Sequence, residues 1–455
     1  MLRLFNSLGR AIEDFKPIAA PEVKIYTCGP TVYDYQHVGN YSGYIYWDVL
    51  VRLLKTSGYN VKRVMNITDV GHLVSDADEG EDKLEKGAHR EGKTARQVAD
   101  FYTEDFKKNV KKLNLSETDV YAQATDYIPE QLKIIEQLVD KGFAYKTEQA
   151  IYFDVSKLAD YGKLTGQKLS EKEVGARADV VTDSAKHHPQ DFALWFFTVG
   201  RFADHEMRWQ SPWGEGFPGW HIECSAIIHS VLGDPIDIHT GGVDHIGTHH
   251  TNEIAQTEAA FGHELANFWL HNNHMMVDGQ KISKSLGNSI TLDDLEKRDF
   301  SAMDFKMLVL QSHYRSQSNF TWEGLEAAST RLKNVYAWAD LVHQHGVVKQ
   351  VMSASAQDYM AALEDDLRTS DLLMLIELNM DKAPKQDLLE KAELLLGLGL
   401  NNRPDINGSS KELIKQREEA RKNQDWHKSD ELRDELTKDG IGLRDTDNGT
   451  IWYRL

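Results

Sequence analysis

The chain has 455 residues, of which 41% are apolar and 27% are charged. A chain of this length can bury more than one core and has the composition of a globular protein, which excludes disulfide-dependent miniature folds and general disorder. Its 52 basic and 71 acidic residues give a formal net charge of -19, which argues against indiscriminate binding of nucleic acid.

The first predicted element is a strand over residues 23–28, which alternates in polarity and ends at a Gly-Pro turn. Apolar residues at helical spacing predict a helix over 40–56, with Gly58 at the position of a C-cap. A second strand is predicted over 61–67. Strand, helix and strand in this order predict a right-handed βαβ unit with two parallel neighbouring strands, in a sheet of the nucleotide-binding type.

The middle of the chain is predicted to interrupt this sheet and then resume it. Residues 76–93 are highly charged and predict an exposed loop before a helix that begins near Thr94. Residues 127–205 have the pattern of an insertion, which contains a predicted helix over 128–141, a short strand over 150–153 and a polar run over 180–190. A second α/β segment resumes near Pro218, with a strand over 236–239 and a helix over 249–261. We expect the two sheet halves to form one domain.

The remainder is predicted to be helical. After Ser301 the pattern is wholly helical and indicates a bundle, with apolar residues of 325–342 on one helix face. Residues 401–410 have the composition of a linker, which would detach a last module of about 45 residues. No apolar run approaches the roughly 20 residues that a membrane helix needs, and the start of the chain is too short and polar for a signal peptide, so we expect a cytoplasmic protein without a membrane partner.

Two segments have features of a nucleotide site. His37, Gly39 and Asn40 stand where a strand turns into a helix N-terminus, and such a terminus favours phosphate. Alone, a histidine beside glycine is more typical of a turn. Lys281 and Lys284 lie three residues apart in a small-residue loop after the second sheet half, where lysines can neutralise the charge that grows on a pyrophosphate leaving group. Alone, that segment is more typical of a solvated surface loop; the two segments together, in this order, strengthen each other.

A third set has the chemistry of metal ligands. The chain has two cysteines, too few for a disulfide framework: Cys28 ends the first strand and Cys224 lies in a segment rich in Gly and His. His249 and Glu253 are spaced i and i+4 on one helix face. Cysteine, histidine and carboxylate all bind zinc. Free cysteines are often simply buried, but both of these adjoin the expected nucleotide site, which favours the metal hypothesis.

Together these segments resemble the cysteinyl-tRNA synthetases, a family of class I aminoacyl-tRNA synthetases. The resemblance covers essentially the whole chain and rests on residues 4–8, 26–34, 66–69, 191–195, 219–225, 249–256, 425–426 and 449–452. It implies a split Rossmann-type parallel sheet with an inserted connective domain, followed by a helical bundle and a small C-terminal module. The implied domains are 1–126 and 206–279 (the two catalytic halves), 127–205 (insertion), 280–322 (a KMSKS-like lysine loop and stem-contact region), 323–402 (anticodon-stem bundle) and 403–455 (anticodon-binding module).

The family's activity is ATP-dependent conversion of L-cysteine to cysteinyl-adenylate, with transfer to the 3′ end of tRNA(Cys). The resemblance also implies a monomer with one Zn²⁺ per chain, which selects the cysteine thiolate over serine, and Mg²⁺ that accompanies ATP. Residue by residue, it implies the following roles: catalysis by His37, Lys281 and Lys284; ATP binding by His37, Gly39, Asn40 and Lys284; the amino-acid pocket formed by Thr68, Trp220, His239 and Asp244; zinc ligation by Cys28, Cys224, His249 and Glu253; and anticodon reading by Arg421, Trp426 and Asp430.

The sequence departs from the family pattern at three places, and two other functions stay open. Asn40 stands where a second histidine is frequent, residues 70–72 replace acidic residues, and Phe217 replaces an arginine. One alternative is a cysteine-activating ligase of the mycothiol pathway, which acylates an amino sugar; the other is an inactive paralogue that binds tRNA. A tRNA partner would meet local basic faces, either Lys107, Lys108, Lys111 and Lys112 or Lys411, Lys415, Arg417, Arg421 and Lys422.

Overall fold

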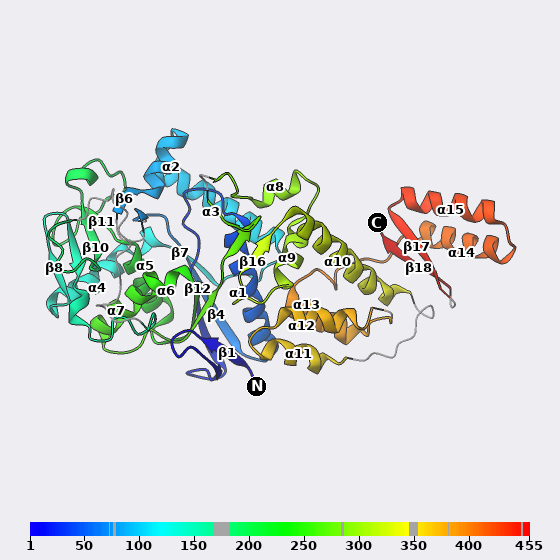
Figure 1. Ribbon diagram of the computed structural model, residues 1–455, viewed down its shortest axis with the longest axis horizontal. Coiled ribbons are helices and arrows are strands. Elements are labelled where there is room, and N and C mark those ends of the chain that lie inside the picture. The colour runs from blue at the N-terminus through cyan, green and yellow to red at the C-terminus, as the bar shows by residue number, and fades with distance from the viewer. Residues whose placement is uncertain are drawn as a thin grey trace.

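The computed structural model describes residues 1–71, 73–75, 79–166, 183–283, 286–344, 354–380, 382–446 and 449–455. Figure 1 shows an elongated molecule in which an α/β part, a helical bundle and a small module near the C-terminus follow one another along the long axis. Within these residues, no helix is both long and apolar enough to cross a membrane.

A five-stranded parallel sheet organises the α/β part. Its strand order is β13 (Ala266–Asn272), β12 (Ile236–Gly242), β3 (Glu22–Thr27), β4 (Asn60–Ile67) and β7 (Val120–Gln123). The predicted βαβ unit is confirmed, because β3 and β4 are parallel neighbours joined through α1 (Val38–Thr56). The fold class is confirmed as well, since strands from both sides of the insertion share this one sheet.

Alternating side chains of the strands supply two separate cores. On β3, Ile25 contributes to the core shared with α1 and α3 (Ala95–Lys112), whereas Tyr26 faces the opposite core. That second core contains Cys224 of α5 (Trp220–Ile227) and Ile254 of α7 (His249–Phe261). Because each strand buries both faces, the sheet is a rigid base for the loops at its carboxyl edge.

The insertion supplies three strands of a separate antiparallel sheet, and the fourth, over Gly216–Pro218, lies beyond the insertion's predicted end at residue 205. The order of this sheet is β11 (Gly216–Pro218), β10 (Phe192–Phe197), β9 (Ala150–Phe153) and β8 (Ala144–Lys146), with α4 (Ile128–Asp140) packed in the same core. The helix and strand predicted for this region are therefore confirmed. Most of the predicted polar run 180–190 is described, but residues 180–182 lie outside the described residues.

The charged segment 76–93 was predicted as a loop, and this prediction is wrong for most of its length. It contains β6 (Glu79–Asp82), which pairs with β5 (Leu73–Ser75), and α2 (Lys83–Glu91). Asp82 caps α2 by accepting hydrogen bonds from the backbone N–H groups of Leu84 and Glu85. Leu84 and Ala88 bury one narrow face of α2, so a few apolar side chains and a cap suffice to fold a helix of high charge.

The region after Ser301 is mainly but not wholly helical. Its bundle consists of α9 (Ala302–Leu310), α10 (Trp322–Asp340), α11 (Ala356–Glu364), α12 (Thr369–Glu377) and α13 (Gln386–Leu396), preceded by the short α8 (Leu292–Glu296). Against the prediction, β16 (Ser318–Phe320) pairs with β14 (Met275–Val277), which also pairs with β15 (Gln280–Lys281). The lysine segment is thereby joined to the bundle through a three-stranded sheet.

The last module packs two helices on a hairpin. They are α14 (Gly408–Lys422) and α15 (Trp426–Lys438), on β17 (Ile441–Thr446) and β18 (Gly449–Arg454). The predicted linker 401–410 is too long by its last residues, because α14 already begins at Gly408, where Asn407 accepts a hydrogen bond from Ser410 N. Residues 407–410, which have the composition of a linker, therefore form the capped N-terminus of α14.

Candidate functional site

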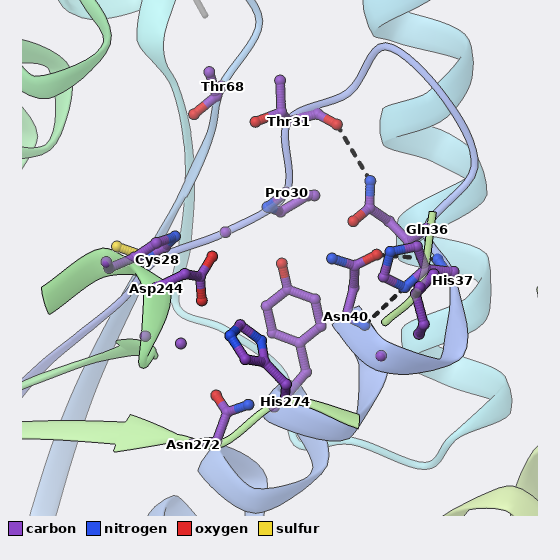
Figure 2. Close-up of a pocket in the computed structure, with 18 of the residues that line it drawn as sticks. Cys28, Pro30, Thr31, Gln36, His37, Asn40, Thr68, Asp244, Asn272 and His274 are labelled. Atoms are coloured by element: carbon purple, nitrogen blue, oxygen red, sulfur yellow. Dashed lines mark hydrogen bonds between the residues drawn. The ribbon is translucent and has the colours of Figure 1, made fainter. Parts of the chain in front are cut away.

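A cavity of about 630 Å³ lies where the carboxyl ends of β3, β4 and β12 face the N-terminus of α1. Strand order reverses between β3 and β12, and ligands of open parallel sheets bind at such a switch point. Figure 2 shows side chains that converge on this space from several elements, including Cys28, His37, Asn40, Thr68, Asp244 and His274.

His37 and Asn40 build the start of α1 together. His37 Nδ1 accepts a hydrogen bond from Asn40 N at 3.2 Å, and Asn40 Oδ1 accepts one from His37 N at 3.1 Å. This is a reciprocal capping box, so Asn40 has a structural role at the position where the family often has histidine. Because Nδ1 of His37 is an acceptor, a neutral ring carries its proton on Nε2, which can donate to an anionic ligand.

The lysine segment lies directly against this helix start. A Cβ added to Gly39 would lie 2.7 Å from Ile282 Cδ1, so a larger residue at this position would require the Ile282 side chain to move. Val38 N donates to Ile290 O at 2.8 Å, which ties the end of the same loop to α1. Lys281 lines the cavity, whereas the predicted catalytic residue Lys284 lies outside the described residues.

Four predicted metal ligands from three elements come together beside the cavity, and two of them, Cys28 and His249, line it. Donor atoms of Cys28, Cys224, His249 and Glu253 all lie within 4.8 Å of one another, and all four residues are buried. Cys28 follows β3, Cys224 is on α5, and one face of α7 supplies the other two.

The electrostatics of this cluster suit a cation. Burial alone would raise the pKa of Glu253, but His239 and His249 hold it at about 2, so the carboxylate is charged. Glu253 Oε1 accepts no hydrogen bond although it is fully buried and lies 3.0 Å from His249 Nε2. A buried carboxylate oxygen without a donor, next to two thiols and an imidazole, fits a zinc ion, for which sulfur, nitrogen and oxygen are all ligands.

A second set of four donors overlaps the first. Cys28, His239, His250 and Glu253 also have donor atoms within 4.8 Å of one another. His239 was predicted to line the amino-acid pocket; the structure buries it behind the cavity wall, where Nε2 lies 2.8 Å from Glu253 Oε2. Sequence reasoning missed His250, although the pair of adjacent histidines at the start of α7 was a usable signal.

The other three predicted pocket residues do line the cavity. They are Thr68, Trp220 and Asp244. The Trp220 ring stacks on His249 with centroids 4.1 Å apart, and the hydroxyl of Thr68 donates to Glu223. Burial raises the pKa of Glu223 to about 8. Glu223 was not predicted, because its role depends on contact with Thr68 from a distant strand end.

The predicted anticodon residues lie in the separate C-terminal module. Trp426 is 57% exposed, and the Arg421 guanidinium lies 5.6 Å from its ring centre, while Asp430 is exposed on the same helix as Trp426. Trp452, not Trp426, belongs to the module's core. Arg417 was placed in a basic face, but it is buried and forms an ion pair with Asp445 at 2.8 Å.

Two family profiles match the sequence. The tRNA synthetases class I (C) catalytic domain matches residues 14–330, and the cysteinyl-tRNA ligase anticodon binding domain matches residues 403–454. Curated relatives match along nearly the whole chain. A cysteine–tRNA ligase of Treponema denticola is 38% identical and covers 100% of both chains; cysteine–tRNA ligase 1 of Burkholderia lata is 41% identical and covers 98% of this chain and 96% of its own.

Solved structures agree on the fold. Methionyl-tRNA synthetase of Mycobacterium tuberculosis, in complex with methionyl-adenylate, superimposes with a TM-score of 0.58 at 14% identity. The match covers 84% of this chain and 88% of the other. At that identity, the likeness shows that the architecture is shared and no more.

Proposed function

The chain belongs to the cysteine–tRNA ligase family, and from that premise we propose that it activates L-cysteine with ATP and transfers it to tRNA(Cys). The observation that carries the proposal is the position of the thiol-rich donor cluster, two of whose members, Cys28 and His249, line the same cavity as the start of α1 and Lys281. The same cavity can therefore hold a nucleotide next to a group that recognises sulfur. We also propose a cytoplasmic monomer with Mg²⁺ bound to ATP.

The metal cluster accounts for selection of cysteine. An apolar pocket discriminates poorly between near-isosteric side chains such as those of cysteine and serine. Cys28, Cys224, His249 and Glu253 would hold Zn²⁺, which binds a thiolate strongly and a serine hydroxyl weakly. Trp220 stacks on His249 and so limits the space beside the ligands, while the carboxylate of Asp244 in the cavity wall suits an α-ammonium group.

The chemical step needs positioning and charge stabilisation. The cysteine carboxylate oxygen forms a bond to the α-phosphorus of ATP, and the bond from that phosphorus to pyrophosphate breaks. His37 Nε2–H at the N-terminus of α1, together with Lys281 and Lys284, would stabilise the charge that grows on the phosphates. In the second step the terminal ribose hydroxyl of tRNA attacks the carbonyl carbon and AMP leaves.

Nothing in the comparisons supports either alternative function. The relatives that match along the whole chain are named cysteine–tRNA ligases, and an anticodon-binding profile matches 403–454. A ligase that acylates an amino sugar has no use for such a module. The four donors and Lys281 that the proposed activity requires are all present, which leaves the inactive paralogue without a supporting observation.

Replacement Cys224→Ser tests the proposal. We expect loss of bound zinc and of cysteine-dependent pyrophosphate exchange, because a serine oxygen is a poor ligand for this metal. The matched control is Ser230→Ala, which removes a hydroxyl bonded to the backbone carbonyls of Ala226 and Ile227, away from the metal donors. Full zinc content and normal cysteine affinity in Cys224→Ser would contradict the metal assignment.

A further inference from the structure

A line of hydrogen-bonding side chains leads from Cys28 into the protein interior. Cys28 Sγ lies 3.2 Å from His250 Nε2, His250 Nδ1 lies 2.8 Å from His271 Nε2, and His271 Nδ1 lies 2.8 Å from Ser7 Oγ. All four residues are at least nine-tenths buried. None of the catalytic or substrate-binding roles proposed above uses His250, His271 or Ser7.

Packing fixes the orientation of His250. The ring packs against both His239 and Trp269, with centroid distances of 4.4 Å and 5.2 Å. A Cβ added to Gly241 would lie 2.6 Å from His250 Cε1, so the ring lies close against the neighbouring strand. This packing holds Nε2 of His250 toward Cys28.

The donor and the acceptor of each hydrogen bond in this line follow from the chemistry of its first member, Cys28. A metal-bound cysteine is a thiolate and can only accept, so His250 Nε2 must donate to it. The Nδ1 of a neutral His250 must then accept from His271 Nε2–H, and His271 Nδ1 must accept from the Ser7 hydroxyl. Each ring then carries its proton on Nε2; the thiolate at one end sets this direction, and the Ser7 hydroxyl at the other end can donate accordingly.

We propose that His250, aligned by His271 and Ser7, is a positioning residue of the metal site that donates a hydrogen bond to the Cys28 thiolate. This inference rests on the proposed function. Two thiolates and a carboxylate around a dication leave a net negative charge in a buried place, and an N–H donor directed at one sulfur offsets part of it. The donor also holds Cys28 in the conformation that binds metal.

A competing role for His250 is direct ligation. Its Nε2 belongs to the second four-donor set, and it also lies 3.3 Å from His245 Nδ1. Ligation through Nε2 would put the ring proton on Nδ1 and reverse every hydrogen bond of the line. The two roles therefore predict different effects on the coordination sphere when the distant members of the line are changed.

The first experiment measures zinc affinity by chelator competition in the full-length protein. We expect about tenfold weaker binding in His271→Leu, a smaller loss in Ser7→Ala, and partial recovery in His271→Gln, whose amide can still donate to His250. His205→Leu is the matched control, because it removes another buried histidine of the α/β part that contacts Met207 O and Phe217 but no metal donor. Wild-type affinity in both His271→Leu and Ser7→Ala would overturn the proposal.

The second experiment replaces zinc with Co²⁺ and records the visible spectrum. Loss of a hydrogen bond to sulfur should shift the thiolate-to-cobalt charge-transfer band in His271→Leu and Ser7→Ala, while the ligand-field bands that report coordination number stay unchanged. Altered ligand-field bands in His250→Gln would identify His250 as a ligand and overturn the positioning role. If the wild-type protein binds no metal, the proposed function itself fails, whereas normal wild-type binding with insensitive variants rejects this inference alone.

Discussion

Asn40 shows how one side chain can serve both local structure and ligand binding. Its Oδ1 accepts from His37 N in the capping box, which keeps the first turn of α1 open toward the cavity. We expect Asn40→Ala to destabilise the protein by about 1 kcal/mol, the usual cost of a lost cap interaction. Because His37 then loses its anchor, the KM for ATP should rise more than the KM for cysteine in pyrophosphate exchange.

Asn60→Ala is a suitable control for this variant. Asn60 Nδ2 donates to Glu22 at an exposed site at the start of β4, away from the cavity. Equal effects of both replacements on the KM for ATP would show that Asn40 acts only through general stability.

Lys284 is expected to act mainly in the transition state. In Lys284→Ala the rate of adenylate formation should fall while cysteine binding stays close to normal, because the charge it would meet develops as pyrophosphate leaves. Single-turnover kinetics separate the two quantities. Lys297→Ala, which removes an exposed lysine paired with Asp294, is the control. A rise in the KM for cysteine at unchanged turnover would exclude this role.

At the scale of elements, one buried lysine of α9 contacts three other helices, namely α1 and the C-caps of α3 and α13. Lys306 of α9 is fully buried, and its Nζ donates to Leu113 O, Asn114 O and Gly397 O at 3.1 to 3.2 Å and to Asp48 of α1 at 3.5 Å. These carbonyls follow the C-termini of α3 and α13, where a positive charge is favoured by the helix dipole. The catalytic sheet's covering helices and the bundle thus share one polar junction.

Lys306→Met should reveal this junction by its pH dependence. Burial lowers the pKa of Lys306 to about 8, below the roughly 10.4 of an unfolded lysine. Between these pH values the unfolded state binds more protons at this lysine than the folded state does. The contribution of Lys306 to the free energy of unfolding therefore increases as pH rises from about 8 to 10.4 and decreases as pH falls. We expect Lys306→Met to lower the free energy of unfolding by about 3 kcal/mol at neutral pH. The replacement should also abolish this lysine's part of the pH dependence of that free energy.

Denaturant unfolding at several pH values measures both effects. Lys297→Met provides the control at an exposed position and should leave the slope unchanged. An identical pH dependence in wild type and Lys306→Met would contradict the assignment of a depressed pKa to this lysine.

These contacts also show where sequence reasoning stops. Helix α7 was predicted to the residue, and α4 to within one, because their apolar periodicity and boundaries are local signals. Strand β16 was missed because its partner β14 is distant in sequence, and helix α2 was missed because its high charge hides a short apolar face and a cap at Asp82. The four metal donors could be proposed from residue type, whereas the line from His250 to Ser7 and the burial of Lys306 depend on tertiary packing that periodicity does not encode.

At the scale of the whole molecule, the carboxylate of Asp340 makes the main polar contacts between the bundle and the C-terminal module. Asp340, fully buried at the end of α10, accepts two hydrogen bonds from Arg403 at 2.8 and 2.7 Å and lies 2.7 Å from Arg454 Nη1. Gln344 adds two hydrogen bonds to the backbone of Trp452, each 3.0 Å long. These contacts therefore hold both the predicted linker, through Arg403, and strand β18, through Trp452 and Arg454.

Asp340→Ala should weaken tRNA charging and leave cysteine-dependent pyrophosphate exchange unchanged, because the cavity lies in a different part of the molecule. Truncation after Asn402 removes the module and sets the largest expected loss of tRNA charging. We expect the charging activity of Asp340→Ala to lie between those of the truncated and the wild-type protein. Asp365→Ala, which removes a partner of Arg3 and Arg368 near the other end of the bundle, is the control. Charging at the wild-type level by the truncated protein would mean that the module does not read tRNA.

The order of strands in the central sheet has a consequence for synthesis on the ribosome. Strand β3 is made early, yet its neighbour on one side is β12, which pairs Ile238 with Ile25 only after the whole insertion has been translated. Until then β3 has an open edge, and long-range parallel pairing is slow to form. Cys28 emerges long before Cys224, His249 and Glu253, so the four-donor cluster cannot form until α7 has been translated, and metal loading cannot precede that point.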